Sequence, residues 1–373
     1  MNLLDPLELA QALIRAPSVT PVDAGAQDVL AQPLEQMGFR VHRLRFGVID
    51  NLFARLGDAG PHLCFAGHTD VVPPGEGWRH PPFAAEVADG VLYGRGACDM
   101  KGGVAAFVSG VAQHLAAGKP HGSISLLITG DEEGDAVDGT TKVLDWMAEH
   151  GERPDFCIVG EPTCRACLGD VVKIGRRGSM DARITVRGIQ GHSAYPQKAD
   201  NPVHRLVRAL GALIAAPLDA GSEWFEPSSL QVTSVDVGNP ASNVIPGVAH
   251  ARLNIRFNDH HSSASLTEHL RHTLREHAPD HDLAVSVSGE WFLTDPGAGV
   301  RTLAHAIEQA TCVTPKLDTG GGTSDARFIA RLCPVAEFGA IGSTMHKVDE
   351  SVPVEELRAL AGVYRVIIGA FLP

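Results

Sequence analysis

The segment ISLLITGDEEGD, residues 124–135, joins an apolar run directly to three acidic residues. Residues 124–130 predict a buried β-strand, because they form a short, mostly apolar run that ends in glycine. Asp131, Glu132 and Glu133 follow at once. An ionised carboxylate is costly to bury unless another charge compensates it, although an isolated acidic run is usually a solvated turn. The remainder of the chain must decide between a turn and a site.

The first half of the chain alternates strand and helix patterns. Apolar runs at 63–67 and 155–160 are further strand candidates, and helical patterns lie near 100–117 and 140–150. This alternation predicts an α/β layer: a mixed, mostly parallel sheet with helices on both faces. The same pattern returns after about residue 294.

The middle of the chain has a different order of elements. Its pattern is strand, helix, two strands, helix, strand, which is the ferredoxin-like βαββαβ order; the segments are 181–188, 201–217, 228–238, 249–257, 263–277 and 282–289. Apolar and polar residues alternate strictly in 249–257, so this strand is covered on one face only. We therefore predict a discontinuous catalytic domain, 1–178 and 294–373, and an inserted dimerisation or lid domain at 179–293.

Composition narrows the class of protein. The 373 residues are 44% hydrophobic and 20% charged, which is typical of a soluble globular protein. The net charge of −13 argues against nucleic acid or an anionic membrane as a partner. The N-terminus carries Asp5 and Glu8 and lacks the basic start of a signal peptide. Seven cysteines, an odd number, favour a reducing compartment, so we expect a cytoplasmic protein.

Metal-binding residue types recur where predicted strands give way to loops, the region where open α/β sheets bind ligands. The segments are AGHTD (His68, Asp70), GRGACDMKGG (Asp99), GDEEGD (Glu132, Glu133) and VGEPT (Glu161), and STMHKVDE adds His346 near the C-terminus. Any single histidine among 18 is usually a surface or core residue. Together, imidazoles and carboxylates without thiolates suit borderline or hard divalent cations.

These segments, with WRHPPF at 78–83, resemble the di-zinc aminoacylase and carboxypeptidase family of metallohydrolases. The resemblance spans roughly residues 60–352. Four further segments are most similar to the desuccinylase branch of that family: 168–179, 191–204, 242–247 and 321–329. The resemblance implies a homodimeric amidohydrolase, paired through the inserted domain, whose substrate is a small N-succinyl amino diacid.

The resemblance also implies a site with two Zn²⁺ per chain, for which Co²⁺ or Mn²⁺ are possible substitutes. Asp99 matches the carboxylate that bridges both ions. His68 and Glu161 match the other ligands of one zinc, and Glu133 and His346 match those of the second.

Three residues match catalytic roles. Glu132 matches the general base, and His192 matches a histidine that reaches the oxyanion from the partner subunit. Asp70 lies two residues after His68, so in extended backbone both side chains point the same way. Its carboxylate could accept the second imidazole N–H of His68, or Asp70 could simply form a turn. For Asp131 we expect a turn or capping role.

Seven residues match positions that line the family's substrate pocket, where an arginine would bind a carboxylate in bidentate fashion. They are Arg176, Ser179, Tyr195, Asn243, Arg256, Gly322 and Thr323. Arg256 could instead belong to a solvated strand face, and Tyr195 could merely cover surface.

Other functions stay open. A sister deacylase, such as an N-acetylornithine deacetylase, or a carboxypeptidase could share the scaffold. A catalytically silent metal-binding relative is a second alternative, although a protein that only binds metal has no need of a general base such as Glu132. A redox or regulatory thiol protein could use CRAC, Cys164 to Cys167, but no second CxxC accompanies it.

Overall fold

The structure is a computed structural model that describes residues 5–373, so residues 1–4 of the predicted catalytic domain lie outside it. The chain divides into two compact units. The main unit comprises the chain up to Ile174, Leu293–Asp318 and Ser324–Pro373. The insert comprises Gly175–Phe292 and also Thr319–Thr323, a segment that the sequence-based division assigns to the catalytic domain. Arg176 holds this segment, because its Nη1 donates to the carbonyl oxygens of Gly320 and Gly322.

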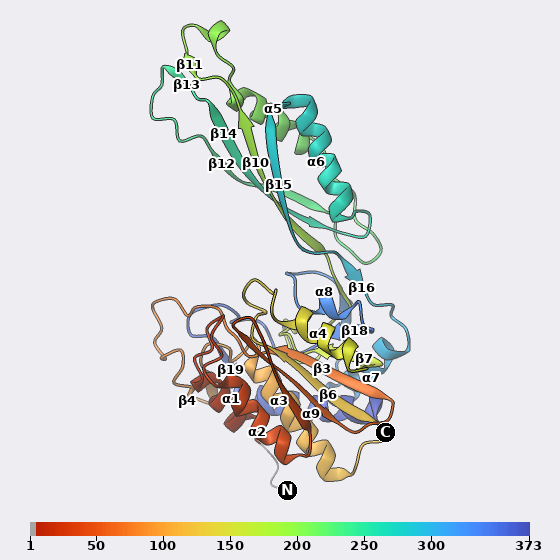
Figure 1. Ribbon diagram of the computed structural model, residues 1–373. Helices are drawn as coiled ribbons and strands as arrows, with labels where there is room; N and C mark the ends of the chain where they lie inside the picture. The colour runs from red at the N-terminus through yellow and green to blue at the C-terminus, as the bar shows by residue number, and fades with distance from the viewer. Residues whose placement is uncertain (1–4) are drawn as a thin grey trace. The chain divides into compact units, whose positions relative to one another are not determined.

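The main unit contains an eight-stranded mixed sheet (Figure 1). In spatial order its strands are β1 (Arg40–Phe46), β2 (Ile49–Leu56), β6 (Ser123–Thr129), β3 (His62–His68), β7 (Phe156–Val159), β18 (Val335–Glu337), β8 (Val171–Lys173) and β17 (Lys316–Asp318). Strands β6, β3, β7 and β18 are parallel neighbours, whereas β1 and β2 form an antiparallel edge. The predicted mixed, mostly parallel sheet is confirmed. All residues of β3 and β6 are buried, as expected for strands covered on both faces.

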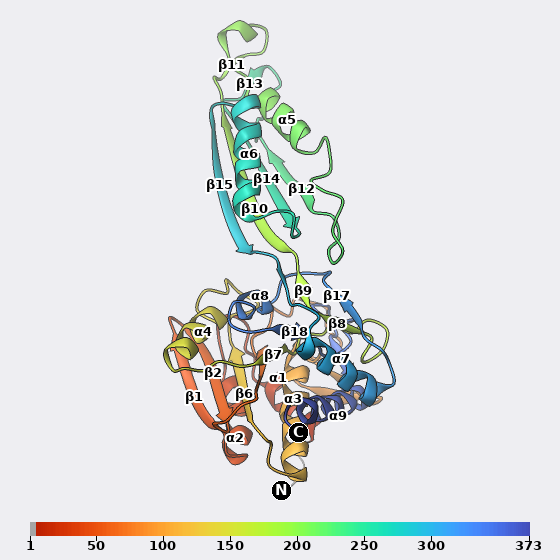
Figure 2. The same cartoon turned by 90° about the vertical axis from the view of Figure 1, so that its right-hand side faces the viewer.

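Helices cover both faces of this sheet. They are α1 (Pro6–Arg15), α2 (Ala26–Gln36), α3 (Lys101–Ala117), α4 (Thr140–Glu149), α7 (Ala298–Thr311), α8 (Ala326–Ile329) and α9 (Val354–Phe371). Figures 1 and 2 show α4 and α8 on one side and α1, α3 and α9 on the other. Phe65 of β3 stacks on Phe107 of α3 with ring centroids 4.1 Å apart, so the helix layer holds the strand that ends at His68. A small sheet of β4 (Glu86–Ala88), β5 (Val91–Tyr93) and β19 (Ser351–Pro353) completes the unit.

The insert has the predicted βαββαβ order. Its elements are β10 (Gly178–Arg187), α5 (Pro202–Leu213), β12 (Ser229–Asp236), β14 (Val248–Phe257), α6 (Ser263–His277) and β15 (His281–Gly289). The four strands form one antiparallel sheet in the order β12-β14-β10-β15. The apolar residues of β14 are buried and its alternate residues are exposed or half-buried, which confirms the one-sided strand. Helix α5 ends at Leu213, four residues before its predicted end.

Short elements complete the chain: β9 (Gly175–Arg176), β11 (Gly191–His192), the 3₁₀ turn Pro196–Lys198, β13 (Val244–Ile245) and β16 (Phe292–Leu293). Among the described helices, none is both long and apolar enough to cross a membrane.

Candidate metal centre

The candidate ligands gather at the carboxyl ends of three neighbouring parallel strands. His68 is the last residue of β3, Glu132 and Glu133 follow β6, and Glu161 follows β7. The carboxyl ends of parallel neighbours meet at one edge of a sheet, so strand order alone brings these side chains close. Asp99 joins them from the turn before α3, and His346 from the segment between β18 and β19.

Asp99 lies between two imidazoles. Its Oδ1 is 3.4 Å from His68 Nε2, and its Oδ2 is 3.2 Å from His346 Nε2. His346 Nε2 is also 2.9 Å from Glu133 Oε1, and His68 Nε2 is 4.0 Å from Glu161 Oε1. The five predicted ligands thus form two trios that share Asp99, each with ligand atoms within 4.8 Å of one another.

These residues fit a pair of divalent cations. His68 Nε2 and Asp99 Oδ1 are buried, and neither has a hydrogen-bond partner among residues 5–373. A buried polar atom without a partner is costly, and a cation between these two atoms would satisfy both. The donor set of two imidazoles and three carboxylates matches the ligand chemistry of zinc sites.

The ionisation of the cluster points the same way. Burial raises the pKa of Asp99, but His346 and His68 beside it hold that pKa below its ordinary value. The hydrogen bonds to Asp99 and Glu133 raise the pKa of His346 to about 10. Protons on the imidazoles therefore balance the carboxylates when no cation does. Because a ligating imidazole must be neutral, metal binding has to displace these protons.

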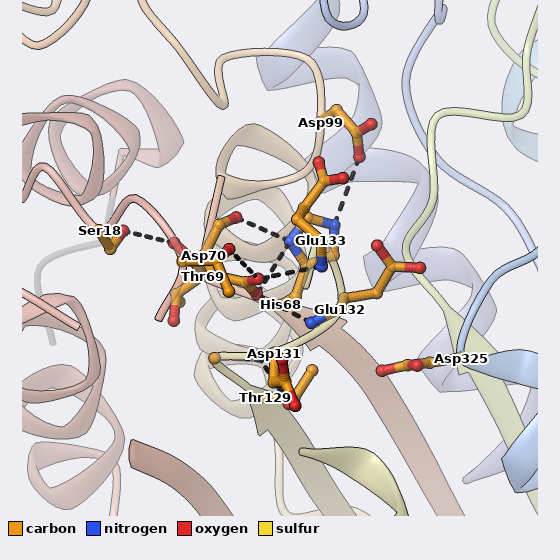
Figure 3. Close-up of polar contacts among 12 residues, drawn as sticks. Ser18, His68, Thr69, Asp70, Asp99, Thr129, Asp131, Glu132, Glu133 and Asp325 are labelled. Carbon is orange, nitrogen blue, oxygen red and sulfur yellow. Dashed lines mark hydrogen bonds and ion pairs between the residues drawn. The ribbon is translucent and has the colours of Figure 1, made fainter. Parts of the chain in front are cut away.

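The three consecutive acids of the opening segment have different surroundings. Burial raises the pKa of Glu132 well above its ordinary value, and the carboxylate of Glu161 raises it further. Glu133 contacts His346, as described above. The carboxylate of Asp131 turns away and accepts the backbone N–H groups of Val137 and Asp138 at 2.9 and 3.1 Å. These hydrogen bonds close the turn after β6 (Figure 3), so the turn role is confirmed for Asp131, whereas the N-cap of α4 is Gly139.

Asp70 contacts His68 differently from the expectation. His68 Nδ1 lies 2.9 Å from the carbonyl oxygen of Asp70 but 3.6 Å from its carboxylate Oδ1. The carboxylate is occupied by other donors: the Thr20 hydroxyl at 2.7 Å and the backbone N–H groups of Glu133 and Glu132 at 3.0 and 3.3 Å. Asp70 therefore fixes the loop of the two glutamates and orients His68 through the backbone.

Comparison with known proteins agrees with this geometry. Residues 64–370 match the peptidase family M20/M25/M40. The chain belongs to this family. An M20-family dinuclear metal-binding peptidase from Bacillus subtilis has the same fold, with a TM-score of 0.75 over 98% of this chain and 96% of that one at 15% identity.

Two further comparisons cover nearly the whole of this M20-family chain. A succinyl-diaminopimelate desuccinylase from Acidiphilium cryptum is 61% identical over 368 residues, 99% of each chain. An aminopeptidase from Bacillus cereus aligns with a TM-score of 0.82 over 100% of this chain and 99% of that one, at 21% identity.

One further carboxylate, which the sequence did not reveal, lies near the candidate ligands. Asp325 is buried, its Oδ2 accepts the Thr140 hydroxyl at 2.6 Å, and its Oδ1 has no hydrogen-bond partner among the described residues. Figure 3 shows it beside Glu132, and burial raises its pKa to about 6. The signal that could have found it is its position directly after the glycine-rich GGGTS.

The predicted substrate residues and His192 form two groups within the insert. His192, Tyr195 and Asn243 lie around β11 and β13: the rings of His192 and Tyr195 are 5.7 Å apart, and Asn243 O accepts the N–H of Ser193. The other group comprises Arg176, Ser179, Arg256, Gly322 and Thr323. In it, Ser179 and Arg256 are cross-strand partners, and Arg176 donates to Gly322 O at 3.0 Å. Figure 2 shows β11 and β13 at the end of the insert sheet opposite β9.

The cysteines of CRAC sit in unlike surroundings. Cys164 is buried and its Sγ accepts the N–H of Gly169 at 3.2 Å, whereas Cys167 is exposed. Burial raises the pKa of Cys164 to about 11. A thiol with so high a pKa is a poor nucleophile, which weakens the thiol-protein hypothesis.

Proposed function

We propose that the chain is a di-zinc amidohydrolase that cleaves N-succinyl-LL-2,6-diaminopimelate into succinate and LL-2,6-diaminopimelate, a cytoplasmic step of bacterial lysine biosynthesis. The observation that carries the hydrolytic chemistry is the position of Asp99 between two imidazoles, with the half-buried Glu132 in the same cluster. The choice of substrate is supported by the 61% identity to a desuccinylase over the whole chain.

In this proposal Asp99, His68 and Glu161 would hold one ion, and Asp99, Glu133 and His346 would hold the other. When bound, the two ions polarise the scissile carbonyl and lower the pKa of the attacking water. Zinc is the metal we propose, with cobalt or manganese as substitutes that the same ligands accept.

Glu132 carries the proton. As the water oxygen bonds to the succinyl carbonyl carbon, the carboxylate of Glu132 accepts the water proton, and it returns a proton to the amine nitrogen as the C–N bond breaks. Asp70 supports this role, because it holds the backbone N–H of Glu132 and of Glu133. A carboxyl whose pKa is raised by burial can hold the proton between the two transfers.

The insert supplies the remaining contacts. Arg176 and Arg256 bind carboxylates of the substrate, with Ser179, Gly322 and Thr323 beside them, and His192 donates to the developing oxyanion with Tyr195 and Asn243 near it. The ten residues of β10 separate the two groups, which corresponds to roughly 30 Å at the rise of a strand. One small substrate cannot reach both ends, so we propose that His192 acts in the site of a second copy.

A surface for that second copy lies beside one edge of the insert sheet. Val207 on α5 is 57% exposed, Ile214, the C-cap residue of α5, is 59% exposed, and Val235 on the edge strand β12 is 48% exposed. Apolar side chains gathered on a surface mark protein–protein contacts. We propose that the homodimer forms along β12 and α5.

The assay that tests this function compares two substrates. We expect kcat/KM for succinate release from N-succinyl-LL-2,6-diaminopimelate to be at least about a hundredfold higher than kcat/KM for acetate release from N-acetylornithine. The reason is that a site built to hydrogen-bond one substrate group strongly rejects a substrate that lacks it. A preference for acetylornithine would assign the chain to a sister deacylase instead. Loss of all activity after dialysis against a chelator, and recovery with Zn²⁺, checks the metal dependence.

A further inference from the structure

A buried ion pair lies directly behind the candidate metal centre. Arg95 and Glu350 are 2% and 0% exposed, and Arg95 Nη1 is 2.7 Å from Glu350 Oε2. Desolvation of two charges largely cancels their attraction in the protein interior, so a buried pair contributes little net stability. The contacts of the pair indicate what else it does.

The second oxygen of Glu350 holds the backbone at Asp99. Glu350 Oε1 accepts the N–H groups of Cys98 and Asp99, both at 3.0 Å. Hydrogen bonds to an ionised acceptor are stronger than neutral ones. Asp99 is the residue shared by the two trios of candidate ligands, so the acceptor fixes the backbone from which the shared carboxylate projects.

The same pair also holds the segment that carries His346. Arg95 Nη1 donates to the carbonyl oxygen of Lys347 at 3.3 Å, and Glu350 O accepts the N–H of Gly94 at 2.9 Å. Glu350 itself is four residues after His346. The guanidinium further donates to Pro74 O at 3.2 Å and lies 5.1 Å from the ring of Trp78. One ion pair thus connects three segments that are distant in the sequence.

We infer that Glu350, oriented by Arg95, is a positioning residue that sets the backbone of Asp99 relative to His346 and so preorganises the site for the second cation. Groups that orient metal ligands typically change metal affinity or activity by about 10–100-fold when they are removed. The effect on turnover rests on the proposed function, whereas the effect on metal binding does not.

The test uses two double variants that differ only in the acceptor. Removal of Glu350 alone would leave the Arg95 charge buried and unpaired, so Arg95 is replaced in both. R95M/E350Q keeps an amide oxygen that can accept the N–H groups of Cys98 and Asp99. R95M/E350M has similar bulk and no acceptor.

The readout is titration of the metal-free protein with Co²⁺, followed by its visible absorption and by calorimetry. We expect R95M/E350Q to bind two Co²⁺ per chain, one of them more weakly than the wild type does because the contacts of Arg95 are lost. We expect R95M/E350M to bind that ion more weakly than R95M/E350Q does by a further factor of about 10–100, with an altered spectrum. Wild-type binding by R95M/E350M, or equal loss in both variants, would overturn the inference.

A matched control separates positioning from a general loss of stability. Lys173 and Asp318 form another largely buried ion pair in the main unit, with Lys173 Nζ 2.5 Å from Asp318 Oδ2, on the strands β8 and β17 at one edge of the sheet. K173M/D318N should leave both Co²⁺ affinities unchanged, and its melting temperature shows how far removal of a buried ion pair alters stability by itself. If it weakens Co²⁺ binding as R95M/E350M does, the positioning role is refuted. Failure of the wild type to release succinate would refute the proposed substrate and leave the Co²⁺ result intact.

Discussion

The two units of the molecule place their candidate functional residues in opposite ways. In the main unit, five side chains from distant segments come together so that each trio of ligand atoms lies within 4.8 Å. In the insert, the eight candidate residues divide between the two ends of a four-stranded sheet.

The two arrangements suit different functions. A metal centre needs donors within a few ångströms, and neighbouring parallel strands supply them at one edge. In the proposed homodimer, functional groups at the two ends of one sheet would serve two different sites, an arrangement that a symmetric dimer can use.

The largest expected effect tests the two adjacent glutamates of the main unit. E132Q should lower kcat by about 10²–10⁴-fold, because it removes the group that transfers the proton. It should retain two metal ions per chain. E133Q is the matched variant and should lose one of the two ions.

Metal analysis of the purified variants, beside single-turnover kinetics, checks both outcomes. Wild-type turnover in E132Q would remove this residue from the mechanism, and two tightly bound ions in E133Q would remove Glu133 from the ligand set.

The next effect tests the insert. H192A should lower kcat by about 10²–10³-fold, the scale for loss of one donor to an oxyanion. Mixing H192A with E132Q, under conditions that exchange subunits, should restore activity, because each mixed dimer contains one site with Glu132 from one copy and His192 from the other.

Activity that stays absent in the verified mixed dimer would place His192 in its own chain's site, or outside the site altogether. Either result would contradict the proposal that the two ends of the insert sheet serve different sites.

A smaller effect is expected at Thr20, whose hydroxyl contacts the Asp70 carboxylate at 2.7 Å. T20V keeps the shape and loses the hydroxyl, so kcat or metal affinity should fall by about tenfold. T20S keeps the hydroxyl and should behave as the wild type. Equal kinetics for T20V and T20S would show that the hydroxyl does not position Asp70.

The smallest effect concerns His62, at the opposite end of β3 from the candidate ligand His68. His62 is buried on β3 with Nε2 2.7 Å from the Ser125 hydroxyl, and burial lowers its pKa to about 4. The unfolded chain therefore binds this proton first as pH falls below about 6.5. Stability contributed by the neutral histidine is full above that pH and is lost progressively as the pH falls to about 4.

The measurement is the unfolding free energy of the wild type and of H62Q from pH 7.5 to 4.5. The difference between them should shift against the wild type by on the order of 1–2 kcal/mol across this range. If the difference does not depend on pH, the pKa of His62 is the same in the folded and the unfolded state, which would contradict the prediction.

Much of this architecture follows from local pattern. Continuous apolar runs predicted β3, β6 and β7, and strict alternation predicted the one-sided strand β14. The number of buried faces of a strand sets its hydrophobic pattern within a few residues, so this pattern can be read locally. The turn role expected for Asp131 is confirmed for a similar reason. The ligand set came from the family resemblance, and the order of the strands explains why its members meet.

Other contacts leave no mark in the neighbouring sequence. Thr20 and Asp70 are 50 residues apart, Thr140 and Asp325 are 185 apart, and Cys98 and Glu350 are 252 apart. The predicted hydrogen bond from His68 Nδ1 to the Asp70 carboxylate was wrong for the same reason. The spacing of His68 and Asp70 is local, but the donors to that carboxylate, Thr20, Glu132 and Glu133, come from distant segments.

By itself, the sequence determined the strands, the helices, the inserted βαββαβ order and the chemical kind of the site, because periodicity and residue type are properties of short segments. The folded arrangement was needed to show which oxygen faces which imidazole, which buried charges contact the site, and that the candidates in the insert divide between two ends. Those are matters of distance, and hydrogen bonds and ion pairs depend on tenths of an ångström that no local pattern encodes.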